Sequence, residues 1–257
     1  MPEFTKAADV RERKSNPMIE ENKDVFMLAG IPLHSRFILG SGKTSKYTRE
    51  LVEAAIKYAG TELISVAIKR YGTEDMGDIP NGIRILPNTL GAVTAEEAIE
   101  LAHISRDVYH LGNVVKIEIL DETRFLVPDS EATLKATKVL TQEGFQVMPY
   151  IYPELRIAER VVDAGAVAIM PLASPSGSGR GLATRDFIKV LLEKIDVPIV
   201  VDAGISKPSQ ACEAMEMGCT AVMANTALAK AANQRLMAEA FREAIDAGRK
   251  AYLSSLS

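Results

Sequence analysis

The stretch of residues 113–121, Asn-Val-Val-Lys-Ile-Glu-Ile-Leu-Asp, carries the most information about the fold and the site. Side chains alternate between the two faces of a β-strand, so the three β-branched residues at odd-numbered positions share one face. Lys116 and Glu118 share the other face. Burying an ammonium and a carboxylate costs on the order of several kcal/mol per ion unless the two are paired or solvated. The stretch therefore predicts a strand with an apolar face against helices and a charged face toward a site.

Eight apolar, β-branched runs of this kind recur along the chain, with helix-like spacing of apolar residues between most of them. Continuous apolarity is typical of parallel strands that helices cover on the outside. The runs are Phe37–Leu39, Leu63–Ile68, Ile83–Leu86, Val114–Leu120, Val147–Tyr150, Ala166–Met170, Val197–Val201 and Ala221–Met223. Eight such units in 257 residues predict an α/β fold, a single (β/α)8 TIM barrel. A doubly wound sheet is the alternative, which the regularity and the lack of a dinucleotide fingerprint disfavour.

Three segments depart from the repeat. Residues 1–24 are polar and predict a disordered leader, which leaves 25–257 as the catalytic barrel. Phe26–Leu28 and Ile31–His34 flank Ala-Gly and predict an N-terminal hairpin. Residues 70–82 show no convincing helix and form either an active-site lid or a variable loop.

Composition excludes several classes of protein. Lys and Arg number 30 against 34 Asp and Glu, which argues against a nucleic-acid binder. No apolar run is long enough for a membrane span, and no signal peptide is recognisable. Two cysteines are too few for a disulfide scaffold, so a cytoplasmic protein is expected. The histidines lack metal-ligand spacing, and Gly40–Thr44 lacks the first glycine of a P-loop, so no metal and no cofactor is predicted.

The lysine on the inner face has two interpretations. It forms a structural ion pair with Glu118, or it lines the open mouth of the barrel, where barrel enzymes hold their active sites. In the second case, desolvation lowers the pKa of Lys116 so that its amine attacks a carbonyl and forms an imine. Glu118 then moves protons.

The last two predicted strands end in polar residues that point to the same mouth. Asp202 follows the seventh run, where it serves either the site or a helix cap. Asn225 and Thr226 follow the eighth and are suited to cap the next helix. The loops after these strands often bind phosphate in this fold, and Gly204 allows close backbone approach. The glycine-rich loop at 171–181 adds Arg180 as a further anion-binding candidate. The residues alone thus predict a lysine-imine enzyme acting on a phosphorylated carbonyl compound.

Several segments, in order, resemble the bacterial thiazole synthase family of thiamine biosynthesis over about residues 26–254. The most distinctive are NTLGAVTAEEA at 88–98 and NVVKIEIL at 113–120, and VPIVVDAG at 197–204 and GFQVMPY at 144–150 accompany them. The resemblance implies that Lys116 forms an imine with 1-deoxy-D-xylulose 5-phosphate. Sulfur then comes from a ubiquitin-like sulfur carrier protein with a C-terminal thiocarboxylate, and dehydroglycine completes the thiazole phosphate carboxylate.

The resemblance also assigns roles to residues. Glu118 and Asp202 fall where the family has its acid/base carboxylates. The positions that contact the sugar phosphate correspond to Gly177, Ala203, Gly204, Asn225 and Thr226, of which Ala203 is implied by the resemblance alone. Members of the family form homo-oligomers. Two alternatives stay open: another lysine-imine barrel, such as a pyridoxal phosphate synthase-like lyase or a class I aldolase, and a non-catalytic phosphate-binding scaffold.

Overall fold

The computed structural model describes residues 24–40, 48–73, 79–120 and 126–256. Eight strands of this part form one parallel sheet in the order β8-β7-β6-β5-β4-β3-β10-β9. Their bounds are β3 Phe37–Leu39, β4 Leu63–Ala67, β5 Arg84–Asn88, β6 Val114–Ile117, β7 Gln146–Ile151, β8 Met170–Pro171, β9 Val200–Val201 and β10 Ala221–Ala224. Each lies within two residues of, or inside, one of the eight predicted runs.

The two end strands of this order, β8 and β9, close the sheet into a barrel. Parallel bridges join Ile169 to Ile199 and Leu172 to Asp202. Backbone hydrogen bonds run along the same seam, from Val200 N to Ile169 O at 3.0 Å and from Asp202 N to Pro171 O at 3.1 Å. The predicted (β/α)8 barrel is confirmed.

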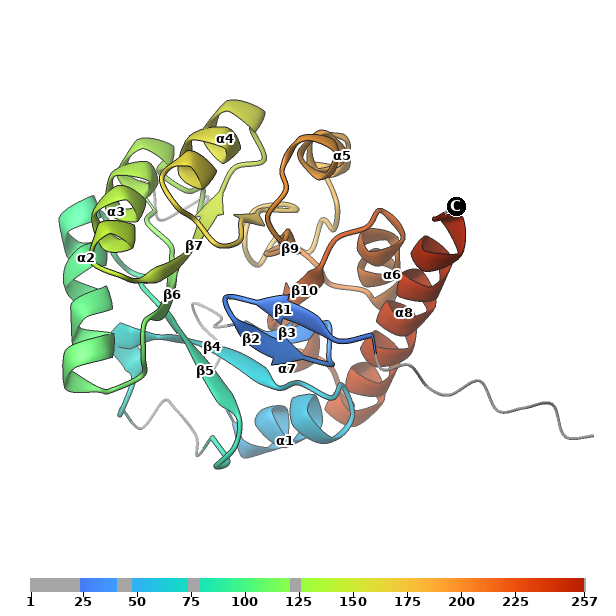
Figure 1. Ribbon diagram of the computed structural model, residues 1–257. Coiled ribbons are helices and arrows are strands. Elements are labelled where there is room, and N and C mark those ends of the chain that lie inside the picture. The colour runs from blue at the N-terminus through green and yellow to red at the C-terminus, as the bar shows by residue number, and fades with distance from the viewer. Residues whose placement is uncertain (1–23, 41–47, 74–78, 121–125, 257) are drawn as a thin grey trace, which may run out of the picture.

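Helices surround the barrel (Figure 1). Their apolar residues pack on the outward faces of the strands, as with Ala98 and Leu140 against Val115 and Ile117. The helices are α1 Arg49–Lys57, α2 Ala95–His103, α3 Ser130–Gln142, α4 Leu155–Asp163, α5 Arg185–Lys194, α6 Pro208–Glu216, α7 Thr226–Ala229 and α8 Gln234–Ser255. Single turns, η1 Ile68–Arg70 and η2 Ile104–Val108, follow β4 and α2.

The predicted N-terminal hairpin is present as β1 Phe26–Leu28 and β2 Ile31–Leu33. Ala29 and Gly30 both have positive φ, as a two-residue hairpin turn requires. The hairpin lies across the centre of the barrel in Figure 1. Its buried side chains pack on the inner residues of the strands, among them Leu86, Met148 and Met223. The N-terminal end of the barrel is therefore closed by apolar side chains.

Residues 1–23 lie outside the described residues, so the leader stays a prediction. Asp24 is held firmly: its carboxylate accepts hydrogen bonds from Arg36 Nε at 2.9 Å and Arg249 Nε at 2.7 Å. These bonds tie the start of the hairpin to β3 and to the C-terminal helix.

The connection from β4 to β5 has no α-helix in its described residues, as the sequence predicts. Residues 74–78, the middle of the proposed lid, lie outside the described part of the chain. Within the described residues, no helix is both long and apolar enough to cross a membrane.

Candidate active site

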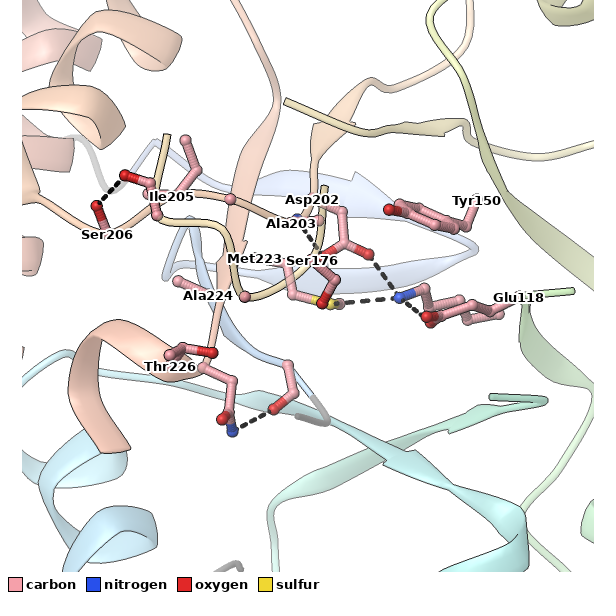
Figure 2. A pocket seen from close by; sticks show the side chains of 16 residues that line it. Glu118, Tyr150, Ser176, Asp202, Ala203, Ile205, Ser206, Met223, Ala224 and Thr226 are labelled. Atoms are coloured by element: carbon pink, nitrogen blue, oxygen red, sulfur yellow. Dashed lines mark hydrogen bonds and ion pairs between the residues drawn. The ribbon is translucent and has the colours of Figure 1, made fainter. Parts of the chain in front are cut away.

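Lys116, on β6, and Glu118, directly after β6, meet the side chain of Asp202 at the C-terminal mouth of the barrel. Lys116 Nζ lies 2.7 Å from Glu118 Oε2 and 2.5 Å from Asp202 Oδ2 (Figure 2). All three side chains are at most a tenth exposed. Val115, Ile117 and Ile119 face the helices, as the alternation predicts. The strand thus places one ammonium between two carboxylates on the inner face.

The expected lowering of the Lys116 pKa is wrong. Burial does lower the pKa, but the charges and hydrogen bonds of Asp202 and Glu118 outweigh it and raise the Lys116 pKa above its ordinary value. Glu118 is the carboxylate that lies beside Lys116 in the sequence, and the fold adds direct contact with Asp202. Lys116 is consequently an ammonium in the resting site.

Two residues that the sequence argument missed hold Glu118. Asn88, at the end of β5, donates from Nδ2 to Glu118 Oε2 at 2.9 Å, and its Oδ1 accepts from Leu90 N. Thr89 Oγ1 accepts from Glu118 N at 2.9 Å. Both side chains are buried. The signal was available, because polar residues that directly end a buried parallel strand face the mouth of the barrel.

A cavity with an empty volume of about 590 Å³ opens beside this lysine. Apart from Arg180, it brings together the residues that the sequence selects for catalysis or phosphate binding. Those residues are Lys116, Glu118, Gly177, Asp202, Ala203, Gly204, Asn225 and Thr226. Ser176, Gly179, Ile205, Ser206, Met223 and Ala224 complete the wall toward β9 and β10, with Gly40 at the end of β3. Arg180 is exposed and does not line the cavity, so the structure does not support it as an anion ligand.

Gly204 is required for a reason other than the predicted one. Its φ is +74°, and a Cβ there would lie 1.8 Å from Ser174 Oγ. Ala203 before it also has a positive φ, of 61°. The glycine lets the loop after β9 pack on the loop after β8, and this packing sets the two successive backbone conformations at the cavity wall.

The side chain of Asn225 does not cap α7 as expected. Its Nδ2 donates to Gly40 O at 2.7 Å instead. Because the partner is a carbonyl, the amide orientation is fixed, and Oδ1 stays buried with no hydrogen-bond partner among the described residues. Asn225 therefore ties β10 to the end of β3 and presents an acceptor at the cavity.

Tyr150 is a further cavity residue that was not predicted from the sequence. It lies near the end of β7, and the alternation from Met148 turns it inward. The Lys116 ammonium lies 5.1 Å from the centre of its ring. An aromatic residue inside an apolar run is normally core, so the sequence carried only a positional signal.

The remaining candidate groups behave as packing or surface residues. His34 contacts Glu62, His103 contacts Glu143, and no cluster of metal-ligating side chains occurs in the described chain. Cys219 is buried, whereas Cys212 is partly exposed and its Sγ lies near Glu216 on the face of α6. Neither cysteine forms a disulfide.

Fold and site define a class of protein: a (β/α)8 barrel enzyme with a charged cavity at the C-terminal end of its strands. The family model described as "Thiazole biosynthesis protein ThiG" matches residues 27–257, and the chain belongs to that family. Proteins named thiazole synthase are 53% identical in Clostridium beijerinckii and 52% in Fusobacterium nucleatum. Each of these alignments spans 238 residues and 91% of both chains. The activity of the chain is thus thiazole synthesis in thiamine biosynthesis.

Solved structures agree with this assignment. One is described as the Amycolatopsis orientalis BexX/CysO complex, with a TM-score of 0.78 and 30% identity over 90% of this chain and 96% of that one. A chimeric (S)-mandelate dehydrogenase matches 95% of this chain and 85% of its own, with a TM-score of 0.62 but 12% identity. The second likeness shows the barrel fold alone.

Proposed function

We propose that Lys116 forms an imine with 1-deoxy-D-xylulose 5-phosphate, the first step in building the thiazole phosphate carboxylate. The observation that carries the proposal is the buried Lys116 ammonium, 2.5 Å and 2.7 Å from two carboxylates in the cavity at the mouth. An ion pair with only a structural role would gain no stability from lying beside an open cavity. The family assignment supplies the reaction that such a lysine serves.

The carboxylates explain how a lysine with a raised pKa becomes a nucleophile. An amine attacks a carbonyl only after losing its proton, and Asp202 is placed to accept that proton over 2.5 Å. Glu118 lies 2.7 Å from the same nitrogen and moves protons on the neighbouring carbon once the imine has made it acidic. The two carboxylates thus have different partners: Glu118 is fixed by Asn88, while Asp202 accepts from Ala203 N.

The sugar phosphate is proposed to lie on the loops after β8, β9 and β10. Gly177, Ala203, Gly204, Asn225 and Thr226 line that side of the cavity. The donors proposed there are the Thr226 hydroxyl and backbone N–H groups other than that of Ala203, which donates to Asp202. The Asn225 side chain contributes an acceptor, Oδ1, which suits a sugar hydroxyl rather than a phosphate oxygen.

The sulfur donor belongs to the same proposal. The similar BexX structure is described as a complex with CysO, and a ubiquitin-like sulfur carrier protein with a C-terminal thiocarboxylate is the corresponding partner here. Dehydroglycine supplies the remaining carbon and nitrogen. A homo-oligomeric assembly and a cytoplasmic location complete the proposal.

Borohydride trapping tests the imine. The protein is incubated in parallel with 1-deoxy-D-xylulose 5-phosphate, with ribose 5-phosphate or with a triose phosphate. Each sample is then reduced, and the mass of the intact protein is measured. One reduced adduct with the first sugar, absent from Lys116→Ala, is expected. An adduct with ribose 5-phosphate instead favours the pyridoxal phosphate synthase-like alternative. A triose phosphate adduct favours an aldolase, and no adduct with any sugar favours the non-catalytic scaffold.

A further inference from the structure

Tyr150 has a hydrogen-bonding group that the folded protein leaves unused. Its side chain is 1% exposed, and its hydroxyl has no hydrogen-bond partner among the described residues. Buried tyrosine hydroxyls normally have a partner, because desolvating one without a hydrogen bond costs about 1–3 kcal/mol. The same residue lines the cavity beside Lys116 (Figure 2). An unsatisfied donor on a residue that lines a substrate cavity points to a contact made when the substrate is bound.

Three of the four carboxylate oxygens of Asp202 and Glu118 already accept another contact, and the Tyr150 hydroxyl bonds to none of the four. Asp202 accepts from Lys116 through Oδ2 and from Ala203 N through Oδ1. Glu118 Oε2 accepts from Lys116 and Asn88. The phenol therefore is not the third partner of this charged group, although in Figure 2 its oxygen lies on the Asp202 side.

The phenol is neutral and able to donate. Burial, and then the charges of Asp202 and Glu118, raise the Tyr150 pKa well above its ordinary value. The hydroxyl thus keeps its proton at neutral pH. A neutral donor near the lysine suits an oxygen that gains negative charge during the reaction.

We propose that Tyr150 is a catalytic residue whose hydroxyl relays protons to the carbonyl oxygen of the sugar while Lys116 forms the imine. This inference rests on the imine proposed above. The Lys116 ring contact at 5.1 Å places any carbon bonded to Nζ near the Tyr150 side chain. The Tyr150 hydroxyl is then a hydrogen-bond donor for the oxygen on that carbon. Neither carboxylate supplies such a donor in the resting site.

The protons balance as follows. Asp202 accepts one proton from the Lys116 ammonium, and the neutral amine forms a C–N bond while the carbonyl π pair moves to oxygen. Tyr150 donates its proton to that oxygen and recovers one from the new C–N ammonium, which gives the carbinolamine. Tyr150 then protonates the carbinolamine hydroxyl, water leaves as the nitrogen lone pair forms C=N, and the phenolate recovers the proton from Asp202. The net reaction is ammonium plus carbonyl to protonated imine plus water.

Tyr150→Phe separates this role from packing, because it keeps the ring and removes only the hydroxyl. We expect the rate of imine formation, measured by rapid borohydride quench and intact mass, to fall about 10²- to 10⁴-fold. Exchange of the sugar carbonyl oxygen with ¹⁸O-labelled water should slow by the same factor. The melting temperature should not fall, because the deleted hydroxyl has no partner in the free protein. Tyr58→Phe, the same deletion at a partly buried tyrosine that does not line this cavity, should change neither rate.

The outcomes separate this inference from the proposed function. Wild-type rates of imine formation and oxygen exchange in Tyr150→Phe, with the adduct still formed by the wild type, would overturn the Tyr150 relay alone. Absence of an adduct in the wild type would overturn the proposed imine and the relay together. Slowed rates with an unchanged melting temperature support the relay.

Discussion

The two ends of the barrel interior are built from the same strands but in opposite ways. At the N-terminal end, Leu28 and Leu33 of the hairpin pack against inner strand residues such as Leu86, and all are buried and apolar. At the C-terminal end, the inward-facing positions carry Lys116, on β6, and Glu118, which directly follows β6. Met223 belongs to both ends: it packs in the apolar cluster, and its Sδ lies 4.0 Å from Lys116 Nζ.

The difference lies in how each end is stabilised. The apolar end gains from burial in proportion to area, and no single partner is essential. The charged end depends on pairing, because a buried ion that loses its partner is left uncompensated. The first end should therefore depend mainly on side-chain volume, and the second on whether each buried charge keeps its partner.

Lys116→Met has the largest expected effect, since it removes both the nucleophile and the cation. No imine adduct should form. Glu118 and Asp202 would then be two buried carboxylates without a counter-ion, and the free energy that their repulsion and burial cost is relieved when a proton binds. Stability from such groups is present at low pH and lost as pH rises. The free energy of unfolding should thus fall between pH 5 and pH 9 by roughly 3–5 kcal/mol relative to the wild type.

The wild type provides the reference for this pH dependence. Its raised Lys116 pKa gives stability that is fully present below the unfolded lysine value of about 10.4, so lysine titration adds no slope from pH 5 to 9. Lys116→Met/Asp202→Asn leaves a single carboxylate and should recover much of the stability at pH 9. Denaturant titrations that show equal pH dependence for Lys116→Met and the wild type would mean that the charged end is not held by pairing.

The charged end also shows how far sequence reasoning reaches. Lys116 and Glu118 were predictable because charges interrupt an otherwise apolar strand, and period two places them on one face. The raised pKa of Lys116 was not predictable from the sequence, because Asp202 is 86 residues away and its 2.5 Å contact with Lys116 depends on how the barrel closes. Tyr150 could not be predicted as a site residue, since an aromatic side chain suits an apolar core as well as an active site. What distinguishes Tyr150 is that its hydroxyl has no hydrogen-bond partner among the described residues, and only the three-dimensional structure shows this.

The closing strands show the same limit in the fold. The predicted runs at 166–170 and 197–201 gave two strands, but regular pairing is confined to Met170–Pro171 and Val200–Val201. The seam between them is held by isolated bridges. Apolar pattern locates a buried strand, whereas the length of its ladder depends on the register and twist of its neighbours.

Leu28→Ala tests the apolar end and has the second largest expected effect. Leu28 is fully buried in the hairpin, so its truncation should lower the free energy of unfolding by about 2–5 kcal/mol. The loss should be the same at pH 5 and pH 9, and imine formation below the melting temperature should be unchanged. Met27→Ala, on the same strand but 55% exposed, should shift stability by less than about 0.5 kcal/mol. Loss of the adduct in Leu28→Ala without any loss of stability would show that the hairpin acts on the site directly.

Asp24→Asn tests an ionic contact at the largely apolar end and has the smallest expected effect. Hydrogen bonding from Arg249, with the charge of Arg36, lowers the Asp24 pKa despite partial burial. A carboxylate with a depressed folded pKa contributes stability above its unfolded value of about 3.9, and this is lost as pH falls through the folded pKa. Because the Asp24 side chain is 36% exposed, the contribution at neutral pH is screened to about 1 kcal/mol.

The variant and the wild type should therefore differ near pH 7 and converge toward pH 2, as followed by urea unfolding across that range. Asp246→Asn is the matched control, because its carboxylate is 59% exposed and 4.0 Å from Arg242 on the same helix α8 that carries Arg249. It should match the wild type at every pH. A stability gap for Asp24→Asn that persists unchanged into acid would mean that the pairing charge is not what ties the hairpin to α8. The hairpin would then be held by packing alone, whereas the C-terminal end of the barrel is held by charge pairing.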